Sequence, residues 1–254
     1  MKRHQGKRIL VTGAAGGIGL ATARFFGEEG ARLYLIDLPG SPLEESARAL
    51  AQTSEVALRH LSVTDEAAVR EAADDMVGRF GGIDAVVNSA GVVVVEPALE
   101  SSIETFRRVV DTNLTGTWIV CQAAARHMAQ NGGGVIVNIS SVYGFQGAPN
   151  RTAYCASKGA VVALTDSLAV EWGPLNIRVN SVAPTGTRTP MVQDLIDRGI
   201  YNVDAVSRRT PLRRLAEPGE VAAACGYLVS QEAGMVTGHH LRVDGGWLAN
   251  GYLM

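Results

Sequence analysis

Five short apolar stretches recur along the chain, and longer segments with helical periodicity separate them. The stretches are RILVTG (8–13), RLYLIDL (32–38), DAVVNSAG (84–91), GVIVNISS (134–141) and IRVNSVAP (177–184). Their apolar residues do not alternate with polar ones, which is typical of strands buried on both faces of a parallel sheet. The pattern predicts an α/β fold, a doubly wound domain with a central parallel sheet of about seven strands and helices on both faces.

The chain reads as one domain over residues 1–254, because no charge run or Pro/Ser-rich linker divides it. Hydrophobic residues make up 46% and the formal net charge is -2, so the composition points to neither a nucleic-acid nor a membrane surface. The N-terminal apolar run is too short for a signal peptide, and no stretch reaches the ~18 apolar residues of a membrane span. We therefore expect a cytoplasmic protein whose partners are small molecules or copies of itself.

Metal binding and disulfides are not expected. The chain has three cysteines, Cys121, Cys155 and Cys225, which are far apart and odd in number, as in reduced, buried thiols. His239 and His240 are adjacent, and neighbours on a strand point to opposite faces, so they make a poor metal pair.

The first apolar stretch runs directly into a glycine-rich turn, VTGAAGGIG, which opens a helical segment. Gly13 allows a tight turn, and Gly17 and Gly19 let a pyrophosphate and the neighbouring strand approach the backbone. Such a turn, standing alone, is as readily an ordinary strand-to-helix connection. Its position at a strand end is where ligands bind in open α/β sheets.

Asp37 ends the second apolar stretch, 18 residues after Gly19 (37 - 19), close to the ~20 typical of an acid that binds an adenosine ribose. Its carboxylate would accept a hydrogen bond from the 2'-hydroxyl and repel a 2'-phosphate. Neither Gly16 nor Leu38 supplies a base for such a phosphate. This predicts NAD rather than NADP; the alternative is that Asp37 only caps the loop at Pro39.

Tyr154 and Lys158 lie four residues apart in TAYCASKG, so on a helix they share one face. A free tyrosine titrates near ~10, and lowering its pKa by about three units costs ~4 kcal/mol. One ammonium at ~4 Å and an effective dielectric of ~20 supplies about that much, which predicts a tyrosine acid/base. When a Tyr-x-x-x-Lys motif stands alone, the alternative is a tyrosine and a lysine that are both exposed on the surface of a helix.

TGAAGGIG, NSAG, Ser141 followed by Tyr154-x-x-x-Lys158, and the terminal VDGG together resemble the short-chain dehydrogenase/reductase family in its compact cytosolic subtype. The resemblance runs from about residue 6 to 250 and implies a Rossmann-like domain. It implies that Tyr154 exchanges a proton with the substrate oxygen, while Lys158 lowers the tyrosine pKa and holds the nicotinamide ribose. It further implies that Ser141 orients the substrate oxygen and that Asn113, in DTNLTG, kinks a helix and positions a relay water.

The resemblance also implies the remaining cofactor contacts. They are Ile18 at the glycine turn; Ser62, Val63, Asn88, Ala90 and Gly91 on the adenosine side; and Pro184, Thr187 and Thr189 at the nicotinamide. Ser62 replaces the family's frequent Asp, so an adenine contact is weaker or passes to the Val63 backbone. After Pro184 the family usually has Gly and this chain has Thr185, which either projects into the substrate pocket or belongs to a loop that turns at Gly186 instead.

The substrate pocket is expected among the loop after the fourth strand, the stretch from Ser141 to Tyr154, and a covering segment at about 188–214. Candidate substrate residues are Gln146, Asn150, Arg151 and Thr185, with a solvated loop as the alternative. Arg188, Arg208 and Arg209 are either surface residues or partners of an acidic substrate.

We therefore expect an NAD-dependent oxidoreductase that transfers hydride between nicotinamide and a secondary alcohol or ketone, on a sugar, polyol or sugar acid. The alternatives are a 3-oxoacyl-carrier-protein reductase-like enzyme, which Asp37 disfavours, and a non-catalytic NAD-sensing protein, which the intact acid/base set disfavours. The family typically forms homotetramers, so a homotetramer or homodimer is expected, with the apolar tail at Trp247, Tyr252 and Leu253 buried against another subunit.

Overall fold

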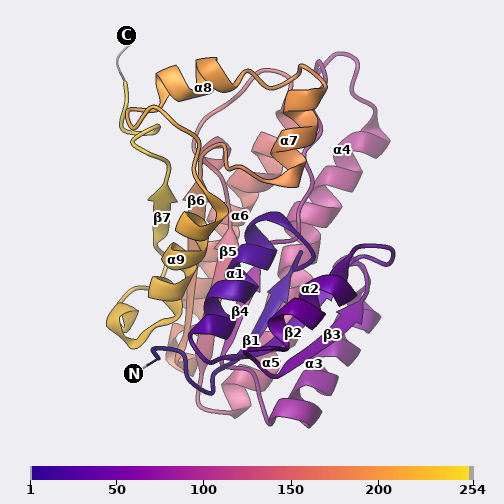
Figure 1. Ribbon diagram of the computed structural model, residues 1–254, viewed down its shortest axis with the longest axis vertical. Helices are drawn as coiled ribbons and strands as arrows, with labels where there is room; N and C mark the ends of the chain where they lie inside the picture. The colour runs from indigo at the N-terminus through magenta and orange to yellow at the C-terminus, as the bar shows by residue number, and fades with distance from the viewer. Residues whose placement is uncertain (1, 252–254) are drawn as a thin grey trace.

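A single parallel sheet of seven strands, in the order β3-β2-β1-β4-β5-β6-β7, organises the chain, as Figure 1 shows for this computed structural model. The structure describes residues 2–251. The strands are β1 (Arg8–Thr12), β2 (Arg32–Asp37), β3 (Val56–His60), β4 (Ala85–Asn88), β5 (Gly134–Ile139), β6 (Ile177–Pro184) and β7 (His240–Val243). The order reverses direction between β1 and β4, so the doubly wound fold predicted from the sequence is confirmed.

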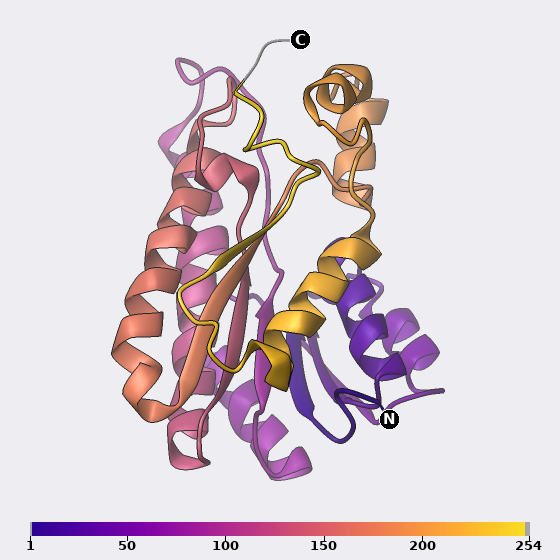
Figure 2. The same ribbon diagram turned by 90° about the vertical axis from the view of Figure 1, so that its left-hand side faces the viewer.

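Helices cover both faces of the sheet (Figure 2). They are α1 (Gly17–Glu28), α2 (Leu43–Leu50), α3 (Glu66–Phe80), α4 (Ile103–Val110), α5 (Gly116–Gln130), α6 (Thr152–Trp172), α7 (Pro190–Asp197), α8 (Val203–Arg209) and α9 (Pro218–Val229). Successive strand residues enter opposite cores: Leu10 packs with α3, α5 and α6, whereas Ile9 and Val11 pack with α1, α2 and α9. Both faces are apolar, which is why the strand sequences show no alternation.

The two edge strands, β3 and β7, are absent from the five stretches that the hydrophobic pattern singles out. All five residues of β3 are only half-buried, and β7 has one exposed and three half-buried residues. An edge strand is covered less completely, so its sequence tolerates polar residues such as Arg59 and Arg242. Continuous hydrophobicity identifies only the central strands.

The carboxyl ends of the strands share one edge of the sheet, above which α7 and α8 lie (Figures 1 and 2). The chain returns to this edge after β7, where Trp247 is buried within its own chain and packs edge-on against Tyr143. The prediction of a tail buried against another subunit therefore does not hold for Trp247; Tyr252 and Leu253 lie outside the described residues. No helix within residues 2–251 is long and apolar enough to cross a membrane.

His4 is fully buried near the N-terminus, a feature the sequence analysis did not anticipate. Its ring packs edge-on against Phe26 at 4.9 Å, and neither ring nitrogen has a hydrogen-bond partner among the described residues. Burial, helped by the nearby charge of Lys7, lowers the pKa of His4 from 6.5 to about 4. A neutral histidine thus serves as an apolar filler here.

Replacing His4 with leucine should flatten the acid side of the stability curve. Between pH 6.5 and 4 the unfolded chain binds a proton at this histidine and the folded chain does not, so stability is lost as the pH falls through this range. We expect wild type to lose about 3 kcal/mol more than His4→Leu between pH 7 and 4, measured by urea unfolding. Equal losses in the two proteins would contradict this assignment.

Candidate active site

Tyr154 and Lys158 lie on one side of the first turns of α6, at the carboxyl edge of the sheet. The Lys158 ammonium donates a hydrogen bond to the carbonyl oxygen of Ile139 at 2.7 Å, which ties α6 to the end of β5. The Lys158 Nζ lies 5.9 Å from the centre of the Tyr154 ring. Lys158 is only 6% exposed, so the ammonium is held inside the protein rather than paired at the surface.

Asn113 sits in a turn of π-helix, Asp111–Thr115, between α4 and α5. Its side-chain oxygen accepts from the N–H of Val92 at 2.8 Å, and its amide nitrogen donates to the Val92 carbonyl and to the Ser157 hydroxyl. The fully buried amide therefore joins the loop after β4 to α6. The interruption of the helix that the family resemblance implies is present as this wide turn.

Ser141 follows β5 and begins a short 3-10 turn, accepting the N–H of Tyr143 at 3.1 Å. Its hydroxyl also hydrogen-bonds the Tyr154 side chain. The neighbouring Ser140 faces the other way, and its hydroxyl lies 3.4 Å from the carbonyl oxygen of Lys158. The structure thus gathers Asn113, Ser141, Tyr154 and Lys158 around one edge, although they come from three separate segments.

The pKa of Tyr154 differs from the sequence-based expectation. Burial raises it to about 12, and the hydrogen bond from Ser141 offsets only part of that rise. Burial also lowers the pKa of Lys158 to about 8. The same burial that positions the Lys158 ammonium weakens its charged form. Burial therefore opposes the charged form of both side chains.

The glycine turn between β1 and α1 leaves space for a bound phosphate. Gly13 has φ +66°, and a Cβ on it would lie 2.9 Å from the backbone nitrogen of Ala90. A Cβ on Gly19 would overlap the carbonyl oxygen of Gly13. Gly17, with φ +54°, faces Thr189 across the turn, and Ile18 packs partly into the core. Only glycine fits this cradle, as a dinucleotide-binding turn requires.

Asp37 is held at the end of β2 by two backbone hydrogen bonds. Its carboxylate accepts the N–H of Ala15 at 2.8 Å and that of Leu38 at 2.7 Å. The carboxylate is therefore fixed beside the glycine turn, and the adjacent Leu38 is 52% exposed and carries no charge. The glycine turn and the fixed acid together fit a nicotinamide dinucleotide.

Two of the residues expected to contact the cofactor, Asn88 and Ser62, have side chains that are hydrogen-bonded elsewhere. Asn88 is 4% exposed, and its amide donates to Asn138 and to the Cys121 thiol, so its side chain belongs to a buried network beneath the crevice. Ser62 points to Thr64, 2.7 Å away, while the Val63 side chain is buried. For these residues the structure leaves backbone groups as the ones able to face a cofactor.

The loop after β6 is pinned from several sides. Thr185 is 7% exposed; its N–H donates to Val243, and its carbonyl accepts the Thr187 hydroxyl at 2.9 Å. A Cβ on Gly186 would strike the hydroxyl of Tyr201. Thr185 is thus packed within the loop, and Gly186 is the position where the loop passes closest to Tyr201. Pro184 ends β6 and directly precedes this loop. At the other end of the loop, the Thr189 hydroxyl accepts the N–H of Val192 at the start of α7.

One candidate substrate residue, Arg151, lies at an aromatic wall, formed by Tyr143 and Trp247, that the sequence analysis missed. Tyr143 lies edge-on to both Tyr154, at 6.5 Å, and Trp247, at 6.4 Å. Arg151 stands over the Tyr143 ring at 5.8 Å, whereas Asn150 is exposed with φ +61°. Tyr143 follows Ser141 by two residues, and that proximity was the available signal; the approach of Trp247 depends on the path after β7.

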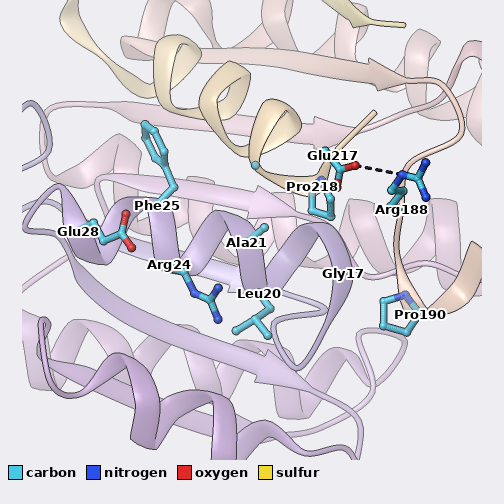
Figure 3. A pocket seen from close by; sticks show the side chains of 11 residues that line it. Gly17, Leu20, Ala21, Arg24, Phe25, Glu28, Arg188, Pro190, Glu217 and Pro218 are labelled. Atoms are coloured by element: carbon cyan, nitrogen blue, oxygen red, sulfur yellow. Dashed lines mark ion pairs between the residues drawn. The ribbon is translucent and has the colours of Figure 1, made fainter. Parts of the chain in front are cut away.

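A pocket of about 450 Å³ opens beside the glycine turn, between α1 and the start of α9 (Figure 3). Gly17, Arg24 and Pro190 line it, and an Arg188–Glu217 ion pair of 3.1 Å closes one side. None of the four acid/base residues contributes to its lining. The pocket borders the glycine turn at Gly17 and is separate from the side chains at Tyr154. Within residues 2–251 no cluster of His, Cys, Asp or Glu could hold a metal ion.

Lys158 should cost folding stability at neutral pH. Its pKa is lowered from 10.5 to about 8 in the folded chain, so between these values the unfolded chain binds more protons and stability rises with pH. We expect wild type to gain about 3 kcal/mol relative to Lys158→Met from pH 7.5 to 10.5 in urea unfolding. The exposed Lys2→Met serves as control, and parallel curves for wild type and Lys158→Met would contradict the prediction.

Comparison with known proteins agrees with this geometry. A family model described as enoyl-(acyl carrier protein) reductase matches residues 13–248. D-threitol dehydrogenase from Mycolicibacterium smegmatis is 41% identical over 249 residues, covering 96% of this chain and 94% of that protein. Cis-4-hydroxycyclohexanecarboxylate dehydrogenase from Sinomonas cyclohexanicum is 41% identical over 243 residues, covering 94% and 96%.

Among solved structures, an NAD+-bound xylitol dehydrogenase superposes with a TM-score of 0.92 at 33% identity, covering 96% of this chain and 100% of that one. Sequence and fold agree with these proteins over nearly the whole chain. The chain belongs to the short-chain dehydrogenase/reductase family.

Proposed function

We propose that this protein is an NAD-dependent dehydrogenase that oxidises a secondary alcohol of a sugar, polyol or sugar acid to the ketone. The observation that carries the proposal is the gathering of Asn113, Ser141, Tyr154 and Lys158 at the edge that the glycine turn and Asp37 also face. The threitol and xylitol dehydrogenases among its relatives support the class of substrate.

In the proposed mechanism, Tyr154 takes the hydroxyl proton of the alcohol as the carbonyl forms. Ser141, which hydrogen-bonds Tyr154, holds the same substrate oxygen beside the phenol. When bound, NAD supplies the acceptor for the hydride that leaves the carbinol carbon with its electron pair. Lys158 and the positive charge of the oxidised cofactor both favour the phenolate, which this site needs because burial alone opposes it. Asn113 keeps the loop after β4 against α6 and, in the proposal, positions a relay water.

The cofactor-binding groups in this proposal include the backbones of Ser62, Val63, Asn88, Ala90 and Gly91 beside the adenosine. Pro184, Thr187 and Thr189 take the nicotinamide end, and the segment at about 188–214 covers the substrate. Thr189 supports this placement because it already faces Gly17 across the turn.

Two other functions are less well supported. A 3-oxoacyl-carrier-protein reductase-like enzyme would usually prefer NADP, and the fixed carboxylate of Asp37 opposes a 2'-phosphate. A non-catalytic NAD sensor has no need of a buried lysine at a tyrosine. The proposal keeps the homotetramer or homodimer and the cytoplasmic location expected from the family resemblance, for sedimentation and fractionation to test.

The activity is tested by NADH formation with a panel of polyols, aldoses, aldonates and cyclic secondary alcohols. We expect at least one class to react and Tyr154→Phe to lose at least ~10³-fold in kcat, since a general base contributes ~10²–10⁴. Oxidation should speed up from pH 6 to 9, because the raised tyrosine pKa leaves little phenolate at low pH. NAD binding without turnover of any alcohol, or full activity of Tyr154→Phe, would count against the proposal.

The choice of cofactor is tested at Asp37. Asp37→Asn keeps an oxygen for the Ala15 N–H and removes the charge, so discrimination against NADP should fall by at least about tenfold while kcat/KM with NAD changes less. Glu45→Gln, on the neighbouring α2, is the matched control for loss of a charge. A higher kcat/KM with NADP in the wild type would overturn the NAD assignment.

A further inference from the structure

Two arginines stand at the aromatic wall without an acidic partner. Arg151 lies over Tyr143, and its guanidinium donates to the carbonyl of Pro149 at 3.2 Å. Arg209, at the end of α8, lies over the Trp247 ring at 4.5 Å and donates to the neutral amide oxygen of Gln146 at 3.2 Å. Among the described residues neither guanidinium forms an ion pair with a carboxylate.

The charge of Arg151 reaches the reacting tyrosine. Arg151 acts electrostatically on Tyr154, Tyr143 and Tyr201, whereas Arg209 acts on Tyr143 alone of these. Both guanidinium groups therefore place positive charge at the aromatic wall, next to Tyr154.

Two acidic residues lie close to this wall. Asp244 follows β7, and its carboxylate accepts two backbone N–H groups. The other is Glu96, on the loop after β4, whose N–H donates to the carbonyl of Asn150 at 2.9 Å. Among the described residues neither carboxylate forms an ion pair with Arg151 or Arg209.

We infer that the substrate carries a carboxylate that binds between Arg151 and Arg209 while its carbon skeleton packs on Tyr143 and Trp247. The Tyr143 ring separates Arg151 from Tyr154, and the rings of Trp247 and Tyr143 separate Arg209 from Tyr154. The carboxylate therefore sits several bonds from the carbon that is oxidised. A carboxylate would replace the neutral amide of Gln146 as the acceptor for Arg209, a stronger, charge-assisted bond. Neutral and acidic alcohols both occur among the substrates in the relatives' names, so those names leave this choice open.

This inference rests on the proposed function, because it names the substrate class of the same site. The alternative is that Arg209 is a structural latch, a residue that only holds α8 against the aromatic wall. Three contacts would serve this purpose: its bond to Gln146, its stacking on Trp247, and the bond of 3.0 Å from the Asn250 side chain to the Arg209 carbonyl. A latch would affect charged and neutral ligands alike. An anion site would affect only the charged ones.

The test is calorimetric binding of cyclohexanecarboxylate and of its neutral isostere cyclohexanecarboxamide to the full chain saturated with NAD. One charge-assisted bond corresponds to about a tenfold or greater gain, so we expect the carboxylate to bind at least about tenfold more tightly than the amide. Arg209→Gln and Arg151→Gln should each close most of that gap and leave amide binding unchanged. Arg208→Gln, from the same helix, is the matched control and should preserve the gap.

Three outcomes would overturn the inference: an amide that binds as tightly as the acid, no binding of the acid at millimolar concentration, or an Arg209→Gln variant that weakens both probes equally. Because binding is read without turnover, these outcomes are separate from a failure of the proposed dehydrogenase activity. Failure of the dehydrogenase activity would appear as no NADH formation with any alcohol of the panel, independently of how tightly the carboxylate and the amide bind.

Discussion

A parallel sheet covered by helices on both faces leaves only its strand ends open to chemistry. In this chain the residues of β1 alternate between two apolar cores, one with α1, α2 and α9 and one with α3, α5 and α6. All strands run in the same direction, so every strand end that carries a polar residue meets the others at one edge. The glycine turn, Asp37, Ser141 and the loop after β6 are neighbours for this reason alone.

Within that edge, precision comes from buried polar contacts rather than from the sheet. The Asn113 amide holds both backbone groups of Val92 and the hydroxyl of Ser157, and the Lys158 ammonium holds the carbonyl of Ile139. These contacts fix the catalytic face of α6, yet they require a charged lysine inside the protein. Function and stability are therefore opposed at this residue.

The sequence was enough to predict the fold class and the central strands, because each leaves a local pattern of apolar runs between helical segments. It also singled out Asn113, Ser141, Tyr154 and Lys158, which the structure brings to one edge and whose roles stay predictions. It did not predict β3 and β7, whose partial exposure removes the hydrophobic signal. It also missed the meeting of Tyr143 with Trp247, since their contact depends on how the chain returns after β7. Spacing alone also conveys nothing about burial, which raises the pKa of Tyr154.

The π-helical turn at Asp111–Thr115 has a consequence for how the helices around it are read. A wide turn accommodates one additional residue, which shifts the phase of every later side chain by about 100°. The inward-facing stripes of α4 and α5 therefore follow two different frames, although the two helices are continuous in the chain. A one-residue deletion here would let α4 and α5 run on as one regular α-helix and would remove the wide turn that holds Asn113 against Val92 and Ser157. The additional residue thus serves the site and not the packing of the helices.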